Sequence, residues 1–408
     1  MKKANLIFSW IAGIIFTLTI SANGQDWPQW RGATRDGNVA GFKAPKTWPK
    51  ELKQEWKITV GLGDATPVLV GNKLYCFTRQ GTDEVLLCLD AASGKEIWQD
   101  KYAAQVIAGP SANAHPGPRS TPVVAEGKIV TLGVAGVLSC IDASKGKVLW
   151  RKENVTNLNP QFFTGMSPII VDGLCIAHIG GKDNGTIIAL DLNSGNEKWK
   201  WTGDGPSYSS PVVMTVDGKK QIVGITEKSL VGLSVADGTQ LWKVDALPQN
   251  RHYNAASPVI DGQTVILTGS GVGTKAVRIE KQGDGFIAKE LWNNPDLGTK
   301  YNTPIIKDGY LYGLSSQRKF YCMDVARGQA AWTDTTIHSD FGSVINCGSV
   351  LMSMPSNSNL IIFKPTEKTY TELAKYKVSD KPVFTTPVIK GNQFYIKENE
   401  TLALYKIE

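Results

Sequence analysis

Polar and aromatic side chains that could bind a ligand gather in short loops, each just before a Ser-Pro or Thr-Pro pair. Histidine exchanges protons near neutral pH, and a cationic side chain beside tyrosine can hold an anionic or hydroxylated ligand. Two of the four histidines lie in such loops, in HPGPRS (115–120) and RHYN (251–254), and a third lies in HSDF (338–341), the corresponding loop of a unit without the proline. The predicted ligand- or partner-binding residues are His115, Arg119, Tyr208, Arg251, His252, Tyr253, Asn254, Lys300, Tyr301, Asn302, His338 and Asp340.

These residues do not form a recognised catalytic or metal-binding motif. The six cysteines include no Cys-x-x-Cys pair, and no histidine has the spacing of a zinc ligand set. His338 and Asp340 could form an acid–base pair, but the loops could equally be a solvated rim. His178 lies in an apolar stretch and is expected in the core. The sequence therefore predicts no catalytic set and no metal site.

The elements that must position these loops are repeated along the chain. Counting back from Trp98, a glycine lies four residues earlier, an aspartate eight and a small residue ten, as in CLDAASGKEIW (88–98). The same offsets recur at Trp150, Trp199 and Trp332, and partly at Trp242. A Ser-Pro or Thr-Pro pair opens a β-branched run in phase with this motif. Prolines 67, 122, 168, 211, 258 and 304 are 43 to 55 residues apart.

Two units depart from the pattern. The gap of 83 residues before Pro387 contains a degenerate unit that begins at FGSVI (341–345), and Tyr376 is predicted to take the place of its tryptophan. The unit ending at Trp292 has a longer insertion around Gly283–Gly285. Both are still expected to form four strands.

Repeats of four short strands over about 40 to 50 residues are typical of propeller blades. The sequence predicts an all-β, eight-bladed propeller of four-stranded antiparallel blades. The last unit stops after its third strand, and QEWKITV (54–60) is a lone tryptophan strand, so the two should join and close the ring. The predicted organisation is a signal peptide (1–24), a leader (25–53) and the propeller (54–408).

Each residue of the repeated motif has a structural interpretation. Asp90 can accept hydrogen bonds from the following turn, and Gly94 can adopt positive φ there. The small residue is expected to leave room for an indole of the adjacent blade. The predicted docking tryptophans are Trp56, Trp98, Trp150, Trp199, Trp242, Trp292 and Trp332. The cysteines are expected to fill the core, with a Cys76–Cys88 bridge as the alternative.

The start of the sequence indicates export, and its charge pattern limits the kinds of partner. Lys2 and Lys3 precede an apolar run from Leu6 to Ile20 and small residues before Gln25, which is typical of a secretory signal peptide. An uncleaved anchor is the alternative, but the run is shorter than the ~20 residues of a membrane span. No cysteine is available for lipid attachment at the cleavage region. The formal charge of +7 is scattered, so a nucleic-acid partner is not expected.

The pattern small-x-Asp-x-x-x-Gly-x-x-x-Trp resembles the PQQ-like (quinoprotein-type) propeller repeat across residues 54–408. That family includes pyrroloquinoline-quinone (PQQ) dehydrogenases, the outer-membrane assembly (BamB-like) propeller and exported propellers without an assigned activity. DWPQWRGATRDG (26–37) also resembles a leader of that last group.

The resemblance implies two alternative functions. The dehydrogenases bind PQQ and calcium, and the alcohol enzymes carry a disulfide between adjacent cysteines, which this chain lacks. We therefore expect a non-catalytic binding or scaffold protein, periplasmic or secreted, without a cofactor, whose partner is an envelope or extracellular protein or a small ligand. The alternative is a PQQ-dependent oxidoreductase that uses the central funnel.

Overall fold

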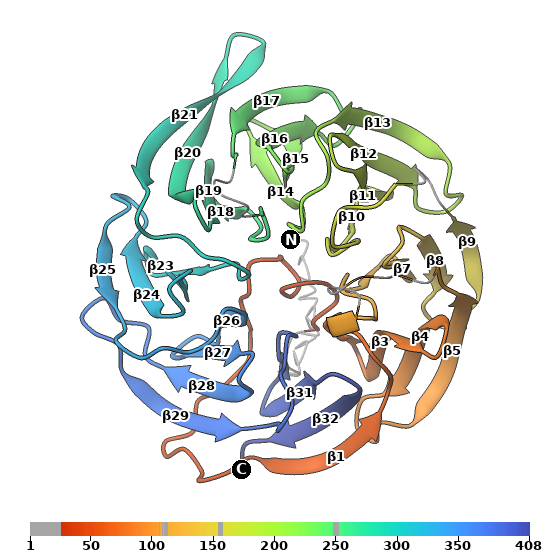
Figure 1. Cartoon of the computed structure of the whole chain (residues 1–408), viewed down its shortest axis with the longest axis vertical. Coiled ribbons are helices and arrows are strands. Elements are labelled where there is room, and N and C mark those ends of the chain that lie inside the picture. The colour runs from red at the N-terminus through yellow and green to blue at the C-terminus, as the bar shows by residue number, and fades with distance from the viewer. Residues whose placement is uncertain (1–25, 106, 108, 110–112, 154–157, 248–252) are drawn as a thin grey trace, which may run out of the picture.

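The computed structural model describes residues 26–408 apart from 106, 108, 110–112, 154–157 and 248–252; the predicted signal peptide, Arg251 and His252 lie outside the described residues. The described chain forms a ring of eight four-stranded sheets (Figure 1). Each sheet is one blade, and its strands follow one another from the centre of the ring to the rim. The predicted all-β, eight-bladed propeller is confirmed.

The first four blades are consecutive antiparallel hairpins. Blade 1 contains β2 (Val68–Val70), β3 (Lys73–Gln80), β4 (Asp83–Asp90) and β5 (Glu96–Ala103). Blade 2 contains β6 (Val123–Ala125), β7 (Lys128–Leu132), β8 (Leu138–Asp142) and β9 (Val148–Lys152). Blade 3 contains β10 (Ile169–Val171), β11 (Leu174–Gly181), β12 (Asn184–Asp191) and β13 (Glu197–Gly203). Blade 4 contains β14 (Val212–Val216), β15 (Lys219–Ile225), β16 (Ser229–Ser234) and β17 (Gln240–Asp245).

The other four blades complete the ring. Blade 5 contains β18 (Val259–Asp261), β19 (Thr264–Gly269), β20 (Gly273–Gln282) and β21 (Gly285–Asn294). Blade 6 contains β22 (Ile305–Lys307), β23 (Tyr310–Leu314), β24 (Phe320–Asp324) and β25 (Ala330–Thr333). Blade 7 contains β26 (Gly342–Asn346), β27 (Leu351–Pro355), β28 (Asn359–Phe363) and β29 (Glu372–Lys377). Blade 8 contains β30 (Val388–Lys390), β31 (Gln393–Lys397), β32 (Thr401–Lys406) and β1 (Lys53–Thr59).

Blade 8 closes the ring with strands from both ends of the chain. β1 pairs antiparallel with β32, from Lys53 opposite Lys406 to Thr59 opposite Thr401. The ring can therefore open only if these backbone hydrogen bonds break. The closure predicted from the lone tryptophan strand is confirmed.

The core lies between neighbouring blades. One cluster, for example, joins Val130 and Leu132 of blade 2 to Cys175 and Ile188 of blade 3. Inner strands are covered on both faces, which is why β16 reads as a continuous buried run. Stability is thus distributed around the ring as a series of blade-to-blade interfaces.

The repeated motif forms the turn between the third and fourth strands. Asp90 Oδ1 accepts the Ser93 amide at 2.9 Å, and Gly94 adopts φ +71°. Asp142, Asp191 and Asp324 accept turn amides in the same way. The predicted roles of the aspartate and the glycine are confirmed.

The glycine has a second role, which corrects the interpretation of the small residue. A Cβ on Gly146 would lie 2.6 Å from the ring of Trp98, which comes from the preceding blade. The small residue instead lies opposite the tryptophan of its own blade, as Cys88 does opposite Trp98. The same inter-blade contact joins Trp56 to Gly94, Trp150 to Gly195, Trp199 to Gly238 and Trp292 to Gly328.

The two irregular units are explained by their strand registers. In blade 5, β20 and β21 form one long hairpin, so Trp242 meets no motif glycine and donates to Gln221 Oε1 at 2.6 Å in its own blade. In blade 7, Ala374 lies opposite Ile362 beside the bulge, which is the tryptophan position of the other blades. Tyr376 lies two residues further on, so its predicted substitution for tryptophan is wrong.

All six cysteines are buried and free. Cys76 lies opposite Leu87, whereas Cys88 lies opposite Tyr75. Successive strand residues point to opposite faces, so the two thiols project from opposite sides of blade 1 and the alternative Cys76–Cys88 bridge is not formed. Within the described part of the chain, no helix is both long and apolar enough to cross a bilayer.

Candidate functional site

A cavity of about 590 Å³ lies where the loops before the first strand of each blade converge. We call it the funnel. Its wall comes from all eight of these loops, and its lining also includes Trp30 and Arg31 of the leader. The loops predicted to hold the site therefore do meet in one place.

The leader crosses the middle of the ring (Figure 1), and its residues Trp30 and Arg31 form part of the funnel lining. Trp27 forms a bridge with Leu69 of blade 1, and Val39 donates its amide to the Asn346 carbonyl of blade 7 at 2.8 Å. Pro28 accepts the amide of Val124 of blade 2 at 2.8 Å. The leader thus contacts several blades at once and acts as a plug.

Two buried arginines hold the plug. Arg35 donates to the carbonyls of Ser167 (2.9 Å) and Pro168 (2.8 Å) in blade 3. Arg31 donates to the Pro304 carbonyl of blade 6 at 2.8 Å. Burial lowers the pKa of Arg31 to about 10 and that of Arg35 to about 9, so both remain charged at neutral pH. Carbonyl dipoles of two well-separated blades therefore solvate the two cations.

The serine or threonine of each Ser/Thr-Pro pair links neighbouring blades below the funnel wall. Ser210 Oγ accepts the Ser167 amide at 2.9 Å, and the Ser210 amide donates to Ser257 Oγ at 2.8 Å. The same bond joins Thr121 to Ser167, Ser257 to Thr303 and Thr386 to Thr66. This belt of hydroxyls explains why serine or threonine precedes the proline, a position that in the sequence only marked the start of each unit.

Above the belt, each of the eight loops contributes one conspicuous side chain to the funnel wall. Seven are aromatic, and the eighth, from blade 1, is a carboxylate. We call this set the aromatic collar: Asp64, His115, Phe162, Tyr208, Tyr253, Tyr301, Phe341 and Phe384.

The collar rings pack in two groups. Phe162 meets Tyr253 edge to face at 4.9 Å between centroids, and Tyr208 adjoins both. In the other group, Tyr301 stacks on Phe341 at 4.3 Å, and Phe384 meets His115 at 4.8 Å. Such contacts hold flat side chains in defined orientations. The wall therefore consists mostly of fixed aromatic surface.

The polar part of the collar is an aspartate–histidine pair. His115 Nδ1 lies 2.5 Å from Asp64 Oδ2. The other polar atoms of the pair, His115 Nε2 and Asp64 Oδ1, belong to side chains that line the cavity. The pair can thus offer hydrogen-bonding atoms to a ligand in the funnel.

Arg119 fastens two of the collar loops. Its guanidinium donates to the carbonyl of Phe162 and, at 2.9 Å, to that of His115. Burial lowers the pKa of Arg119, while the nearby Asp64 opposes this shift. Arg119 therefore positions the loops and partly balances the charge of Asp64.

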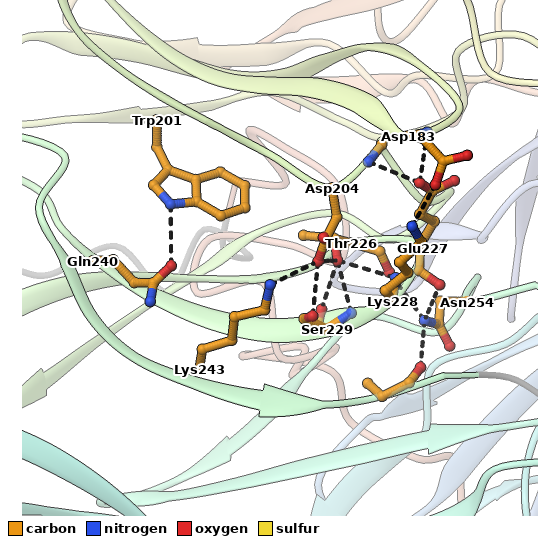
Figure 2. A network of polar contacts seen from close by, with 12 residues as sticks. Asp183, Trp201, Asp204, Thr226, Glu227, Lys228, Ser229, Gln240, Lys243 and Asn254 are labelled. Atoms are coloured by element: carbon orange, nitrogen blue, oxygen red, sulfur yellow. Dashed lines mark hydrogen bonds and ion pairs between the residues drawn. The ribbon is translucent and has the colours of Figure 1, made fainter.

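A polar network joins Asp204, Thr226 and Asn254, which belong to the chain around blades 3 to 5 (Figure 2). Asn254 donates to the Thr226 carbonyl at 3.0 Å and to that of Ala246 at 2.9 Å. The Asn254 carbonyl in turn accepts the Tyr208 amide at 3.0 Å. Asp204 accepts hydroxyls of the same turn, from Thr226 at 3.0 Å among others. The loop that carries Tyr253 is thereby fixed to blade 4.

The predicted site residues divide into three sets. The funnel is lined by His115, Arg119, Tyr208, Tyr253, Tyr301 and Asn302. The buried Asn254 and the residues Lys300, Asp340 and His338 lie outside the lining. Arg251 and His252 fall outside the described residues.

The polar residues outside the lining make other contacts. Lys300 pairs with Asp340 at 3.4 Å and lies over the Tyr301 ring. His338 Nε2 lies 2.9 Å from Asp334, buried beside Phe320, so its carboxylate partner is not Asp340. His178 is buried as expected, and burial lowers its pKa to about 4.

Sequence reasoning missed several lining residues. Asp64, Phe162 and Phe341 were not among the predicted site residues, nor were Trp30 and Arg31 of the leader. The sequence does carry a spacing signal for the funnel wall. Five collar residues lie two positions before the serine or threonine that opens their blade: Asp64, Tyr208, Tyr301, Phe341 and Phe384. The leader residues had no comparable spacing signal.

The lining does not fit a calcium–quinone pair. Calcium takes about six to eight oxygen ligands, whereas Asp64 is the one carboxylate in the described lining and already contacts His115. The side-chain amide of Asn302 is already hydrogen-bonded to both the carbonyl and the amide of Leu314. No group of three or more His, Cys, Asp or Glu side chains could hold a metal in the described part of the chain.

A closed eight-bladed ring with the repeated Asp-Gly-Trp turn defines the class of PQQ-like propellers. A family model described as outer membrane protein assembly factor BamB matches residues 35–183 and 179–369. The chain therefore belongs to this BamB-like propeller family.

Individual relatives are distant. The BamB protein of Shewanella oneidensis is 24% identical over 254 residues, which cover 59% of this chain and 62% of that protein. The quinohemoprotein alcohol dehydrogenase ADH IIB of Pseudomonas putida is 26% identical over 243 residues, or 58% of this chain and 32% of the enzyme. The chain thus matches about three fifths of the BamB relative and a third of the dehydrogenase.

Solved structures share the fold. BamB from Moraxella catarrhalis superimposes with a TM-score of 0.65 at 13% identity, covering 87% of this chain and 97% of that one. The quinohemoprotein alcohol dehydrogenase of Comamonas testosteroni gives 0.67 at 14% identity, covering 93% and 80%. At these identities the likeness concerns the fold alone.

Proposed function

We propose that this protein is an exported, non-catalytic propeller of the cell envelope that binds a ligand or a partner loop in its funnel, with the rim as a secondary contact surface. The observation that supports this most directly is the aromatic collar. Fixed aromatic side chains around a cavity of about 590 Å³ fit the size and lining expected of a binding site. Their exposure costs hydration free energy that a bound partner would recover.

Family membership supports a role in binding. The matching family model and the Shewanella relative both carry the name of an outer membrane assembly factor. The basic and apolar start of the sequence supports export. A periplasmic or secreted location follows from that proposal.

The alternative function is a quinoprotein oxidoreductase. It is motivated by the relatives named as quinohemoprotein alcohol dehydrogenases. The described lining offers calcium a single carboxylate, Asp64, which favours the binding role.

Two measurements test the proposal. First, purified protein is mixed with PQQ and calcium chloride, and dye-linked oxidation of alcohols is followed. We expect no turnover, and turnover above the level of PQQ alone would contradict a non-catalytic role.

Second, a photo-crosslinking phenylalanine analogue replaces Tyr253 in the funnel or, as the control, Ile97 on the rim strand β5. We expect an adduct from the Tyr253 position that disappears in a Gly165→Phe background, because the added ring fills the funnel. Adducts that persist with the funnel filled, or that form only from Ile97, would contradict funnel binding.

A further inference from the structure

The balance of charge in the funnel narrows the chemistry of its ligand. The described lining holds one carboxylate, Asp64, and two guanidinium groups, Arg31 and Arg119. Both arginines direct donors to backbone carbonyls, and Asp64 contacts His115. An organic cation would be repelled by the arginines, and an anion would lie against Asp64. An uncharged ligand avoids both costs.

The collar also excludes a purely apolar ligand. Such a molecule would displace water from Asp64 Oδ1 and His115 Nε2, the polar atoms of these lining side chains that the Asp64–His115 contact does not use. Burying polar atoms without a hydrogen-bond partner costs desolvation free energy that no new bond offsets. A ligand that fits must therefore carry hydroxyl groups toward the Asp64 side of the wall.

The rest of the funnel wall is aromatic, so it suits a ligand that has flat, weakly polar faces. The rings of Tyr301 and Phe341 are stacked with an interplanar angle of 10°. Phe162, from the loop before blade 3, packs edge to face on Tyr253, from the loop before blade 5. Aromatic faces carry partial negative charge and attract C–H groups. A pyranose ring combines C–H faces with hydroxyl edges and is uncharged.

We infer that the funnel is a carbohydrate-binding site for a neutral pyranose. The sugar ring packs against the collar aromatics, and its hydroxyls donate to Asp64 and exchange a hydrogen bond with His115. The plug residue Trp30 limits how deeply the sugar enters, so the site receives a chain end or a short saccharide. This inference rests on the proposed binding function and specifies the ligand.

The test is a glycan array carrying neutral, acidic and amino sugars, followed by isothermal titration calorimetry with maltose, cellobiose and chitobiose. We expect saturable binding of a neutral glycan. Tyr301→Ala and Asp64→Asn should each weaken it about tenfold, while Tyr301→Phe should retain it because the ring face remains. Ile97→Ala on the rim is the matched control and should bind as the wild type does.

The outcomes distinguish the inference from the function on which it rests. Absence of glycan binding, preference for a charged ligand, or wild-type affinity in both collar variants would overturn the sugar site. If the crosslink at Tyr253 still forms and is lost in the Gly165→Phe background, the proposed binding function stands although the sugar site does not. Circular dichroism and thermal unfolding of each variant separate lost binding from lost folding.

Discussion

Replacing Arg35 with methionine should release the plug from blade 3. Methionine has a similar length, but it cannot donate hydrogen bonds. The substitution removes donors to Ser167 (2.9 Å), Pro168 (2.8 Å) and the side chain of Gln29 (3.1 Å). It also removes the contact of the guanidinium with the ring of Trp30 at 5.6 Å.

The magnitude follows from the two bonds to backbone carbonyls. A hydrogen bond from a charged donor contributes about 1.5–3 kcal/mol net. The burial that lowers the Arg35 pKa to about 9 also means that methionine recovers part of the cost of burying the charge. We therefore take the lower end for each bond and expect the free energy of unfolding to fall by about 3 kcal/mol.

Urea unfolding followed by tryptophan fluorescence measures the change. Arg278→Met is the control, because Arg278 is half-exposed and its ion pair with Glu280 at 3.5 Å should contribute less than about 1 kcal/mol. Hydrogen exchange at the amides of Gly37 and Val39 should also rise in Arg35→Met alone. If Arg35→Met loses no more stability than the control, the arginine does not anchor the leader and the plug interpretation fails.

Two further predictions concern a buried histidine and the blade-to-blade contact. Burial lowers the pKa of His178 to about 4, so the unfolded state binds the proton first as pH falls from about 6.5 to 4, and the free energy of unfolding falls by up to about 3 kcal/mol. His178→Gln should remove this part of the acid dependence when urea unfolding is measured at pH 7 and pH 4.5. If the difference in free energy between the two pH values is the same in wild type and variant, the prediction is contradicted. Gly146→Ala should destabilise by about 2 kcal/mol more than Gly127→Ala. Both glycines have φ near +70°, but an added Cβ meets the Trp98 ring only at Gly146, whereas nothing lies within 4 Å of a Cβ at Gly127. Equal thermal unfolding midpoints of the two variants would rule out a destabilising contact with Trp98.

Much of the fold could be read from the sequence because the motif acts locally. Asp90 and Gly94 form their turn through bonds within a few residues, so the same letters recur wherever a blade repeats the turn. Blade number and ring closure follow from counting such turns. The prediction failed where register mattered: Tyr376 was aligned by residue type, whereas strand pairing places Ala374 at the tryptophan position.

The candidate site was only partly predictable because its residues are neighbours around the ring and not along the chain. The loops before the Ser/Thr-Pro pairs could be expected to converge, and His115, Tyr208 and Tyr301 line the funnel. Loop position alone could not tell which side chains turn inward. His338 contacts Asp334 and packs beside Phe320, outside the funnel lining.

The sequence by itself determined the repeat, the eight blades and the loops in which a site would lie. The tertiary structure decided the partnerships: Asp64 with His115 across 51 residues, and Arg35 with the carbonyls of blade 3 across more than 130. The physical reason is that a turn is specified by bonds between near neighbours. A funnel wall and its plug are instead specified by which distant groups the closed ring brings within hydrogen-bonding distance.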